Sequence, residues 1–164
     1  MNCVSLISEI MSHIGIRFLT MEKDFKTYLD EFDSVVDDEK TVHVSNITPL
    51  YNGDCQIDAL VAPIVTLLNN YGLKTVASCS GHVKRKKPTG YLWIDTKTES
   101  YSKTFDSLHS LPSKVKGVYI DTRSIEDGRF IYRWNCLGIP FDSLKAKLRR
   151  LLVELASIVE KDLQ

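Results

Sequence analysis

The segment Ser78–His82 concentrates more reactive groups than any other part of the chain. It reads SCSGH and supplies two hydroxyls, a thiol and an imidazole around a glycine. Glycine allows unusual backbone dihedral angles, and successive N–H groups at the end of a strand can form a concavity that binds an anion. Four basic residues, 84–87, follow at once. The segment therefore predicts an anion-binding site, and the alternative is a hairpin turn with a solvated basic tip.

Two kinds of reactive chemistry would also use this segment. Cys79 and His82 form half of a zinc site, which Cys55 and Cys136 could complete only if folding happened to bring them there. A Cys79 nucleophile with His82 as its base needs a hydrogen-bond geometry that residues three apart in a tight turn rarely reach. Both interpretations are weaker than ligand binding, so we predict no metal and no catalytic residue.

A nucleotide phosphate would find several partners in and after the segment. The N–H groups of Ser80 and Gly81 are expected to face the phosphate, with serine hydroxyls as further donors to phosphate or ribose. His82, followed by Lys84 or Arg85, would meet its negative charge. A nucleotide is therefore the ligand class that we predict.

The base and the remaining contacts are expected to come from other parts of the chain. Trp93 or Tyr91 offers a ring on which a base can stack, although at least one of them is expected in the core. Arg133 alternates with aromatic residues along a predicted strand and is a candidate for a second anion contact. Asp58 either caps a helix or contacts the ligand. The predicted ligand-binding residues are Ser78, Cys79, Ser80, Gly81, His82, Lys84, Trp93, Arg133 and Asp58.

Hydrophobic periodicity predicts the elements that position these residues. Helices are expected over 21–36, 57–71, 98–111 and 141–164, and a short one within 1–16. Strands are expected over 41–47, 73–79, 90–95, 117–122 and 129–135. Pro63 should lie in a first helical turn or kink its helix, Pro112 should end the helix before it, and 124–128 should form a turn. The order of the strands cannot be obtained from the sequence. We predict a mixed α/β fold of two layers with four to five strands and flanking helices. The chain is expected to form a single domain, 1–164, and the alternative that 1–20 is a loosely attached N-terminal segment stays open.

Composition narrows the function. Of 164 residues, 43% are hydrophobic and 26% charged, which is typical of a globular protein. The 21 basic and 21 acidic residues balance, whereas binding a long nucleic acid usually needs a basic excess. No apolar run reaches the roughly 20 residues of a membrane span, and four widely spaced cysteines indicate a reducing compartment. We therefore expect a cytoplasmic protein that binds neither a membrane nor a long nucleic acid. Whether the chain forms a homo-oligomer is left open by the sequence.

The stretch Asp58–Asp95 carries a resemblance to known proteins. It contains D-x4-P and L-N-N in a predicted helix, then G-x-x-T-x-x-S-C-S-G-H, a variable loop and G-Y-L-W-I-D. This order resembles the methyltransferase family that performs the third step of wybutosine synthesis on tRNA, which has S-C-S-G-R followed by a G-x-W strand. It is also similar to a group of small proteins from bacteria and phages that carry S-C-S-G-H in the same setting.

The resemblance implies two functions that the sequence leaves open. A methyltransferase of the wybutosine type would bind AdoMet as its cofactor and modify a tRNA nucleoside. However, His82 stands where that family has arginine, and Asp95 with Thr96 follows the Trp93 strand where a histidine is expected. We therefore favour a protein without a cofactor that binds a small anionic nucleotide unchanged. By analogy with phage anti-defence proteins, its ligand would be a nucleotide second messenger that it sequesters.

Overall fold

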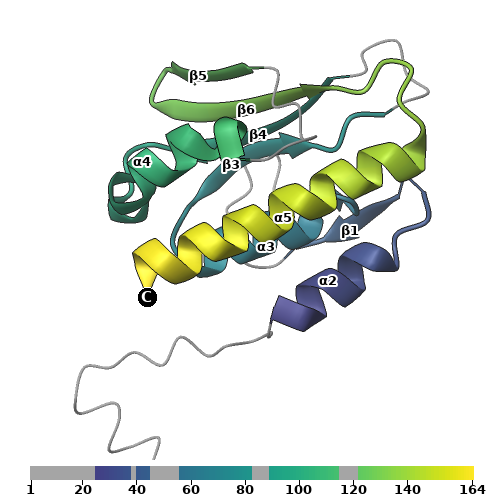
Figure 1. The fold of residues 1–164 in the computed structure, drawn as a ribbon, viewed down its shortest axis with the longest axis horizontal. Coiled ribbons are helices and arrows are strands. Elements are labelled where there is room, and N and C mark those ends of the chain that lie inside the picture. Colours follow the sequence, from purple (N-terminus) through teal and green to yellow (C-terminus); the bar gives the residue numbers. More distant parts are fainter. Residues whose placement is uncertain (1–24, 38–39, 45–55, 83–88, 115–121) are drawn as a thin grey trace, which may run out of the picture.

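The computed structural model describes residues 25–37, 40–44, 56–82, 89–114 and 122–164 (Figure 1). Lys84, Cys55 and the helix expected within 1–16 lie outside these residues. The described helices are α2 (Phe25–Asp33), α3 (Ala62–Asn70), α4 (Glu99–Lys114) and α5 (Phe141–Leu163). The described strands are β1 (Thr41–His43), β2 (Gln56–Asp58), β3 (Thr75–Cys79), β4 (Thr89–Asp95), β5 (Thr122–Glu126) and β6 (Arg129–Asn135).

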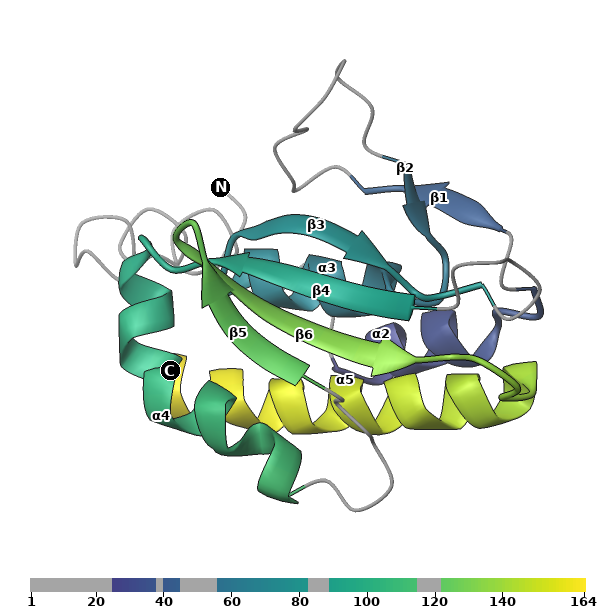
Figure 2. The ribbon, with the colours of Figure 1, turned by 90° about the horizontal axis from the view of Figure 1, so that it is seen from above.

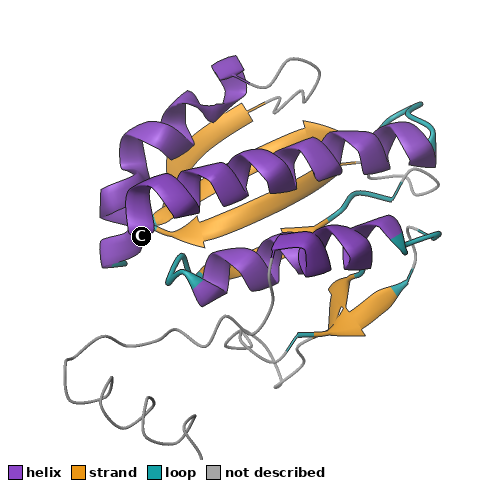
Figure 3. Cartoon of the chain, turned by 60° about the horizontal axis from the view of Figure 1, so that its bottom comes forward, coloured by secondary structure: helices purple, strands orange, loops and turns teal. Residues whose placement is uncertain are grey.

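The described strands form two antiparallel sheets. The main sheet has the order β3-β4-β6-β5, and β1 pairs with β2 in a second, smaller sheet. Helices α3, α4 and α5 lie against one face of the main sheet, which Figure 2 shows in front of them. Figure 3 shows the smaller sheet as a separate pair of strands, and its strand β2 contacts β3 of the main sheet. The predicted mixed α/β fold of two layers is confirmed.

The two faces of the main sheet differ in what covers them. Alternate residues of the two central strands point toward the helices and are buried: Leu92, Ile94, Phe130, Tyr132 and Trp134. The apolar stripe of α5 packs against this layer, as its period predicts. We call the opposite face of β3, β4 and β6 the open face, because no described helix covers it (Figure 2). Its central residues are Tyr91, Trp93, Arg129, Ile131 and Arg133.

Helix α4 does not end where the sequence predicts. It continues through Pro112 to Lys114, although proline cannot donate a hydrogen bond to the carbonyl four residues earlier. That carbonyl belongs to Leu108, and the buried hydroxyl of Tyr132 on β6 donates a hydrogen bond to it at 2.5 Å. A donor from the sheet thus replaces the N–H that Pro112 lacks, and the prediction that Pro112 ends the helix is wrong.

Other boundaries also differ from the prediction. Helix α3 begins at Ala62 rather than near residue 57, because Gln56–Asp58 pairs with β1 as a strand, while Pro63 does lie in the first turn. Helix α2 ends at Asp33, so Val36, predicted on its apolar face, is 83% exposed. Of the strand expected over 117–122, residues 117–121 lie outside the described part of the chain and Thr122 begins β5. Strand β5 continues to Glu126, which leaves only Asp127 and Gly128 for the turn expected over 124–128.

Candidate functional site

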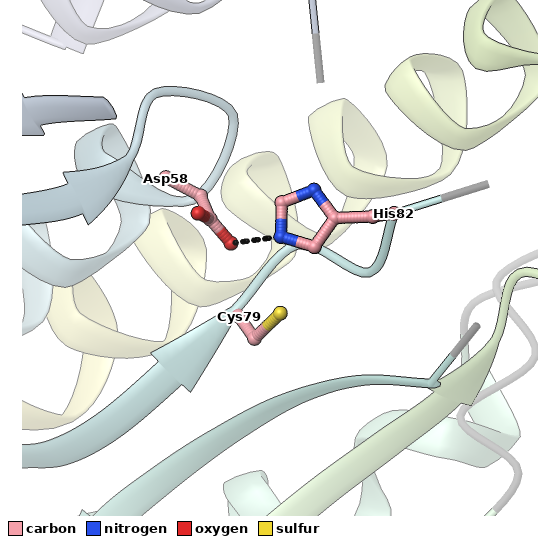
Figure 4. Close-up of side chains that lie close together, drawn as sticks. All are labelled: Asp58, Cys79 and His82. Atoms are coloured by element: carbon pink, nitrogen blue, oxygen red, sulfur yellow. Dashed lines mark ion pairs between the residues drawn. The ribbon is translucent and has the colours of Figure 1, made fainter. Parts of the chain in front are cut away.

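Three side chains that are separated in sequence meet at one end of the main sheet. Asp58 ends β2, Cys79 ends β3, and His82 lies in the loop that follows β3. One donor atom from each, a carboxylate oxygen, the Sγ and an imidazole nitrogen, lies within 4.8 Å of the other two (Figure 4). We call these residues the Asp-Cys-His cluster. The cluster forms because β2 pairs with β1 and packs near the end of β3, which brings Asp58 to Cys79 and His82. The spacing of the three residues in the sequence does not predict this proximity.

The carboxylate of Asp58 occupies the place where a ligand anion was expected. Its Oδ2 accepts hydrogen bonds from the Ser80 N–H at 2.9 Å and from the Ser80 hydroxyl at 3.3 Å. The Gly81 N–H donates to Cys79 Sγ at 3.4 Å. The prediction that the N–H groups of Ser80 and Gly81 face a phosphate is therefore wrong, because both donate to acceptors within the chain.

Asp58 also does not cap a helix. The N-cap residue of α3 is Val61, and no side chain makes a capping hydrogen bond at that end of the helix. The second role predicted for Asp58, a contact with the ligand, stays a prediction, and the structure places this residue beside Cys79 and His82. His82 is only 7% exposed, and its Nε2 lies 3.5 Å from Asp58 Oδ2, so its ring faces the chain's own carboxylate.

The loop that carries Ser80 and Gly81 is fixed by close packing against β4 and the end of β6. The carbonyl of Ser80 accepts a hydrogen bond from Trp134 Nε1 at 2.9 Å and a weaker one from Cys136 Sγ at 3.7 Å. Gly81 has a φ of +83°, and a Cβ there would overlap Cys136 Sγ. Gly90 on β4 is equally restricted, since a Cβ there would overlap the Trp134 ring. Glycine is needed at 81 both for packing and for its dihedral angle.

The environment of Cys79 opposes nucleophilic chemistry. Burial raises the pKa of the Cys79 thiol to about 11, the Gly81 N–H acts in the opposite direction, and the nearby Asp58 carboxylate raises it further. A thiol with such a pKa is protonated near neutral pH. In a catalytic relay, the acid and the nucleophile bind opposite nitrogens of the imidazole. Figure 4 shows Asp58 and Cys79 on the same side of the His82 ring, so the three groups converge on one point instead.

The open face places an aromatic pair and two arginines next to the cluster. Tyr91 is the pairing partner of Cys79 on one side and of Arg133 on the other, so these three residues form a row across the sheet. The rings of Tyr91 and Trp93 are 5.6 Å apart between centroids and tilted by 45°. The guanidinium of Arg129 lies 5.3 Å from the centroid of Trp93. Both aromatic residues are half-buried, and neither belongs to the core.

The structure thus divides the residues predicted from the sequence into groups. Asp58, Cys79, Ser80 and His82 come together in or around the cluster, whereas Trp93 and Arg133 lie on the open face. Ser78 pairs with Leu92, which points toward the helices, and its buried hydroxyl finds no partner among the described residues. Cys136 contacts the Ser80 carbonyl and does not complete the cluster.

Sequence reasoning missed Arg129 as a neighbour of the aromatic pair. The alternation of β6 places it on the same face as Arg133, but only the register with β4 brings it beside Trp93. It also missed a cavity of about 270 Å³ that is lined by residues of α2, β1 and α3 and by Val35, which follows α2. That cavity does not include the cluster or the open face.

No protein-family model, curated protein or solved structure matches this chain. Among the described helices, none has the length and apolar character that crossing a membrane requires.

Proposed function

We propose that the open face of the main sheet binds a small anionic nucleotide, and that the protein holds this ligand without changing it. The observation that carries the proposal is the pair formed by Tyr91 and Trp93, which stands half-buried on a face that no described helix covers, beside the guanidinium of Arg129. Aromatic side chains on the face of a sheet are a common platform for nucleobases, because every base has a π-face.

The aromatic pair would contribute through stacking. The tilt of 45° between the rings leaves them in contact with each other while each keeps part of its surface outside the core. Stacking of a base on an aromatic side chain is worth about 1 to 3 kcal/mol. One base on Tyr91 or Trp93 therefore gives a binding term comparable to one strong hydrogen bond.

The two arginines would supply the contacts to phosphate. Arg133 is directly across from Tyr91, and neighbouring residues of an antiparallel pair have Cα atoms about 4.5 to 5.5 Å apart. A phosphate attached to a nucleoside on Tyr91 is thus within reach of a long, half-buried arginine side chain. A charge-assisted hydrogen bond of this kind contributes about 1.5 to 3 kcal/mol.

The charge and the size of the platform favour a small ligand. Two rings and two arginines accommodate one or two nucleotides, and the balance of 21 basic against 21 acidic residues supplies no excess for a long polymer. The protonated Cys79 thiol is not prepared for attack on such a ligand. Sequestration of a nucleotide second messenger, as in phage anti-defence, is the role that we infer by analogy.

Affinity measurements on variants of the open face test this proposal. Mononucleotides, cyclic mononucleotides and cyclic dinucleotides are titrated by calorimetry into the wild-type chain and into Tyr91→Ala, Trp93→Leu and Arg133→Ala. Each substitution should weaken binding of the preferred nucleotide by about tenfold or more, corresponding to roughly 1.4 kcal/mol.

Matched controls come from the helices. Arg150 on α5 and Phe105 on α4 are exposed, and neither lies on the open face. Arg150→Ala and Phe105→Ala should leave the affinity unchanged, with circular dichroism to show that all variants fold. Equal losses of affinity in both sets of variants would show that the ligand does not bind on the open face. Saturable binding of AdoMet, with methylation of a tRNA nucleoside, would instead establish the methyltransferase alternative.

A further inference from the structure

The Asp-Cys-His cluster combines three donor types that borderline transition metals prefer. Asp58, Cys79 and His82 offer an oxygen, a sulfur and a nitrogen, all within 4.8 Å of one another. Hard cations such as Mg²⁺ and Ca²⁺ select oxygen ligands, whereas a mixed set with thiolate and imidazole suits Zn²⁺. The set is thus of a kind that protein zinc sites use.

The distance between two of the donors matches a shared metal better than a direct bond. Zinc binds imidazole nitrogen at about 2.0 to 2.1 Å and carboxylate oxygen at about 2.0 to 2.2 Å, which at a tetrahedral angle separates the two atoms by about 3.4 Å. His82 Nε2 and Asp58 Oδ2 are 3.5 Å apart. This separation exceeds the 2.7 to 3.2 Å of an ordinary N–H···O hydrogen bond. The two atoms therefore already stand at the spacing of two ligands of one zinc ion.

The donors also converge in direction. Figure 4 shows the Cys79 sulfur and the Asp58 carboxylate on the same side of the imidazole, where Nε2 is located. A protonated thiol must lose its proton to bind zinc as thiolate, and the Gly81 N–H already donates to Cys79 Sγ at 3.4 Å, which favours the negative form of sulfur. One metal ion in the space between the three atoms would contact all of them after small side-chain adjustments.

The surrounding residues hold these ligands in place. The Ser80 N–H and hydroxyl both bind Asp58 Oδ2, and the Ser80 carbonyl is in turn fixed by Trp134 Nε1. Ser80 itself is fully buried, Asp58 and Cys79 stand at the ends of two strands, and His82, three residues after β3, is buried as well. Hydrogen bonds of this outer kind orient metal ligands and raise metal affinity.

From this geometry we infer that Asp58, Cys79 and His82 bind one Zn²⁺ ion, with a fourth position that the described residues leave to water or to an exogenous ligand. Three protein ligands with an open fourth position are the arrangement of zinc sites that interact with a substrate, whereas closed structural sites use four. This inference does not depend on the proposed nucleotide function, since it rests on the cluster alone.

Cobalt titration of the metal-free protein tests the site. After treatment with a chelator and a reductant, Co²⁺ should bind with one equivalent per chain and produce a thiolate-to-cobalt charge-transfer band in the near ultraviolet, and Zn²⁺ should abolish the band by displacement. Cys79→Ser should remove the band and weaken Zn²⁺ binding by at least about a hundredfold. Cys136→Ser is the matched control, because Cys136 is the other described thiol near Ser80 and lies outside the cluster; it should leave band and affinity unchanged.

A second measurement on the wild-type chain avoids any effect of substitution on folding. Zn²⁺ should protect Cys79, but not Cys136, from alkylation by iodoacetamide, as read by mass spectrometry of peptides. The inference is overturned if Co²⁺ gives no thiolate band, if the band survives in Cys79→Ser, or if Zn²⁺ leaves Cys79 unprotected.

Discussion

Substitution of Gly81 by alanine examines the placement of the SCSGH loop, on which the cluster depends. A Cβ at this position would overlap Cys136 Sγ and lie 2.9 Å from the Gly90 nitrogen, and the residue has a φ of +83°. Gly138 provides the matched control: its φ is +69°, but a Cβ there would meet nothing within 4 Å. Alanine at either position therefore carries the conformational cost of a positive φ, but only alanine at position 81 also overlaps packed atoms.

The expected magnitude follows from these two terms. A non-glycine residue in the left-handed region costs about 1 to 2 kcal/mol, and forcing a methyl group into a packed interior costs about 1 to 3 kcal/mol. Gly81→Ala should therefore lower the free energy of unfolding by about 2 to 5 kcal/mol, against about 1 to 2 kcal/mol for Gly138→Ala. Because total stability is typically about 5 to 15 kcal/mol, the first loss is large.

Urea denaturation followed by circular dichroism measures both losses. The midpoint should fall much further for Gly81→Ala than for Gly138→Ala, while the slope m stays constant, so that the change reports stability. Adding Cys136→Ala to Gly81→Ala should restore part of the loss, since the overlapping sulfur is removed. Equal losses for the two glycines would refute the packing of this loop against β4 and Cys136.

Two further predictions concern single groups in the site and the core. Burial raises the pKa of the Cys79 thiol from an ordinary 9.0 to about 11, so its alkylation by iodoacetamide at pH 8, in chelator-treated protein, should be about a hundredfold slower than in the unfolded chain. The alkylation rate, followed by peptide mass spectrometry, should rise about tenfold per pH unit up to about pH 10. A plateau of the rate near about pH 9 would contradict the raised pKa. Tyr132→Phe removes the hydroxyl that donates to the Leu108 carbonyl in place of the N–H that Pro112 lacks, and should lower the free energy of unfolding, measured by urea denaturation, by about 1 to 3 kcal/mol. The control is Tyr101→Phe, which removes a hydroxyl 3.0 Å from the half-buried His109 and should cost less. A smaller loss for Tyr132→Phe than for Tyr101→Phe would refute the role of Tyr132.

The parts of the fold that the sequence predicts well are those whose pattern is local. The alternation of Phe130, Tyr132 and Trp134 along 129–135 identifies β6 and the face that it turns toward the helices, and the period of leucines identifies α5. The end of α4 was not predictable in this way, because the donor that satisfies Leu108 comes from a tyrosine 24 residues further along the chain. Strand β2 has three residues, too few for a periodic pattern.

The candidate site shows the same limit. The sequence identifies Cys79 and His82 as reactive neighbours and Asp58 as a possible site residue, yet it assigns the Ser80 N–H to a ligand. Only the tertiary structure brings the Asp58 carboxylate, 22 residues earlier, to that N–H. Likewise the row of Cys79, Tyr91 and Arg133 requires the strand order and register, which no local pattern encodes.

Recovery of a bound nucleotide tests the central claim most directly. The purified chain is incubated with a mixture of mononucleotides, cyclic mononucleotides and cyclic dinucleotides, separated from free ligand, and heated, and the released material is analysed by chromatography with mass detection. The proposed function predicts stoichiometric release of one nucleotide class with its mass unchanged, and strongly reduced release from Trp93→Leu. Release of a hydrolysed or methylated product, or retention of no nucleotide by the wild-type chain, would contradict it.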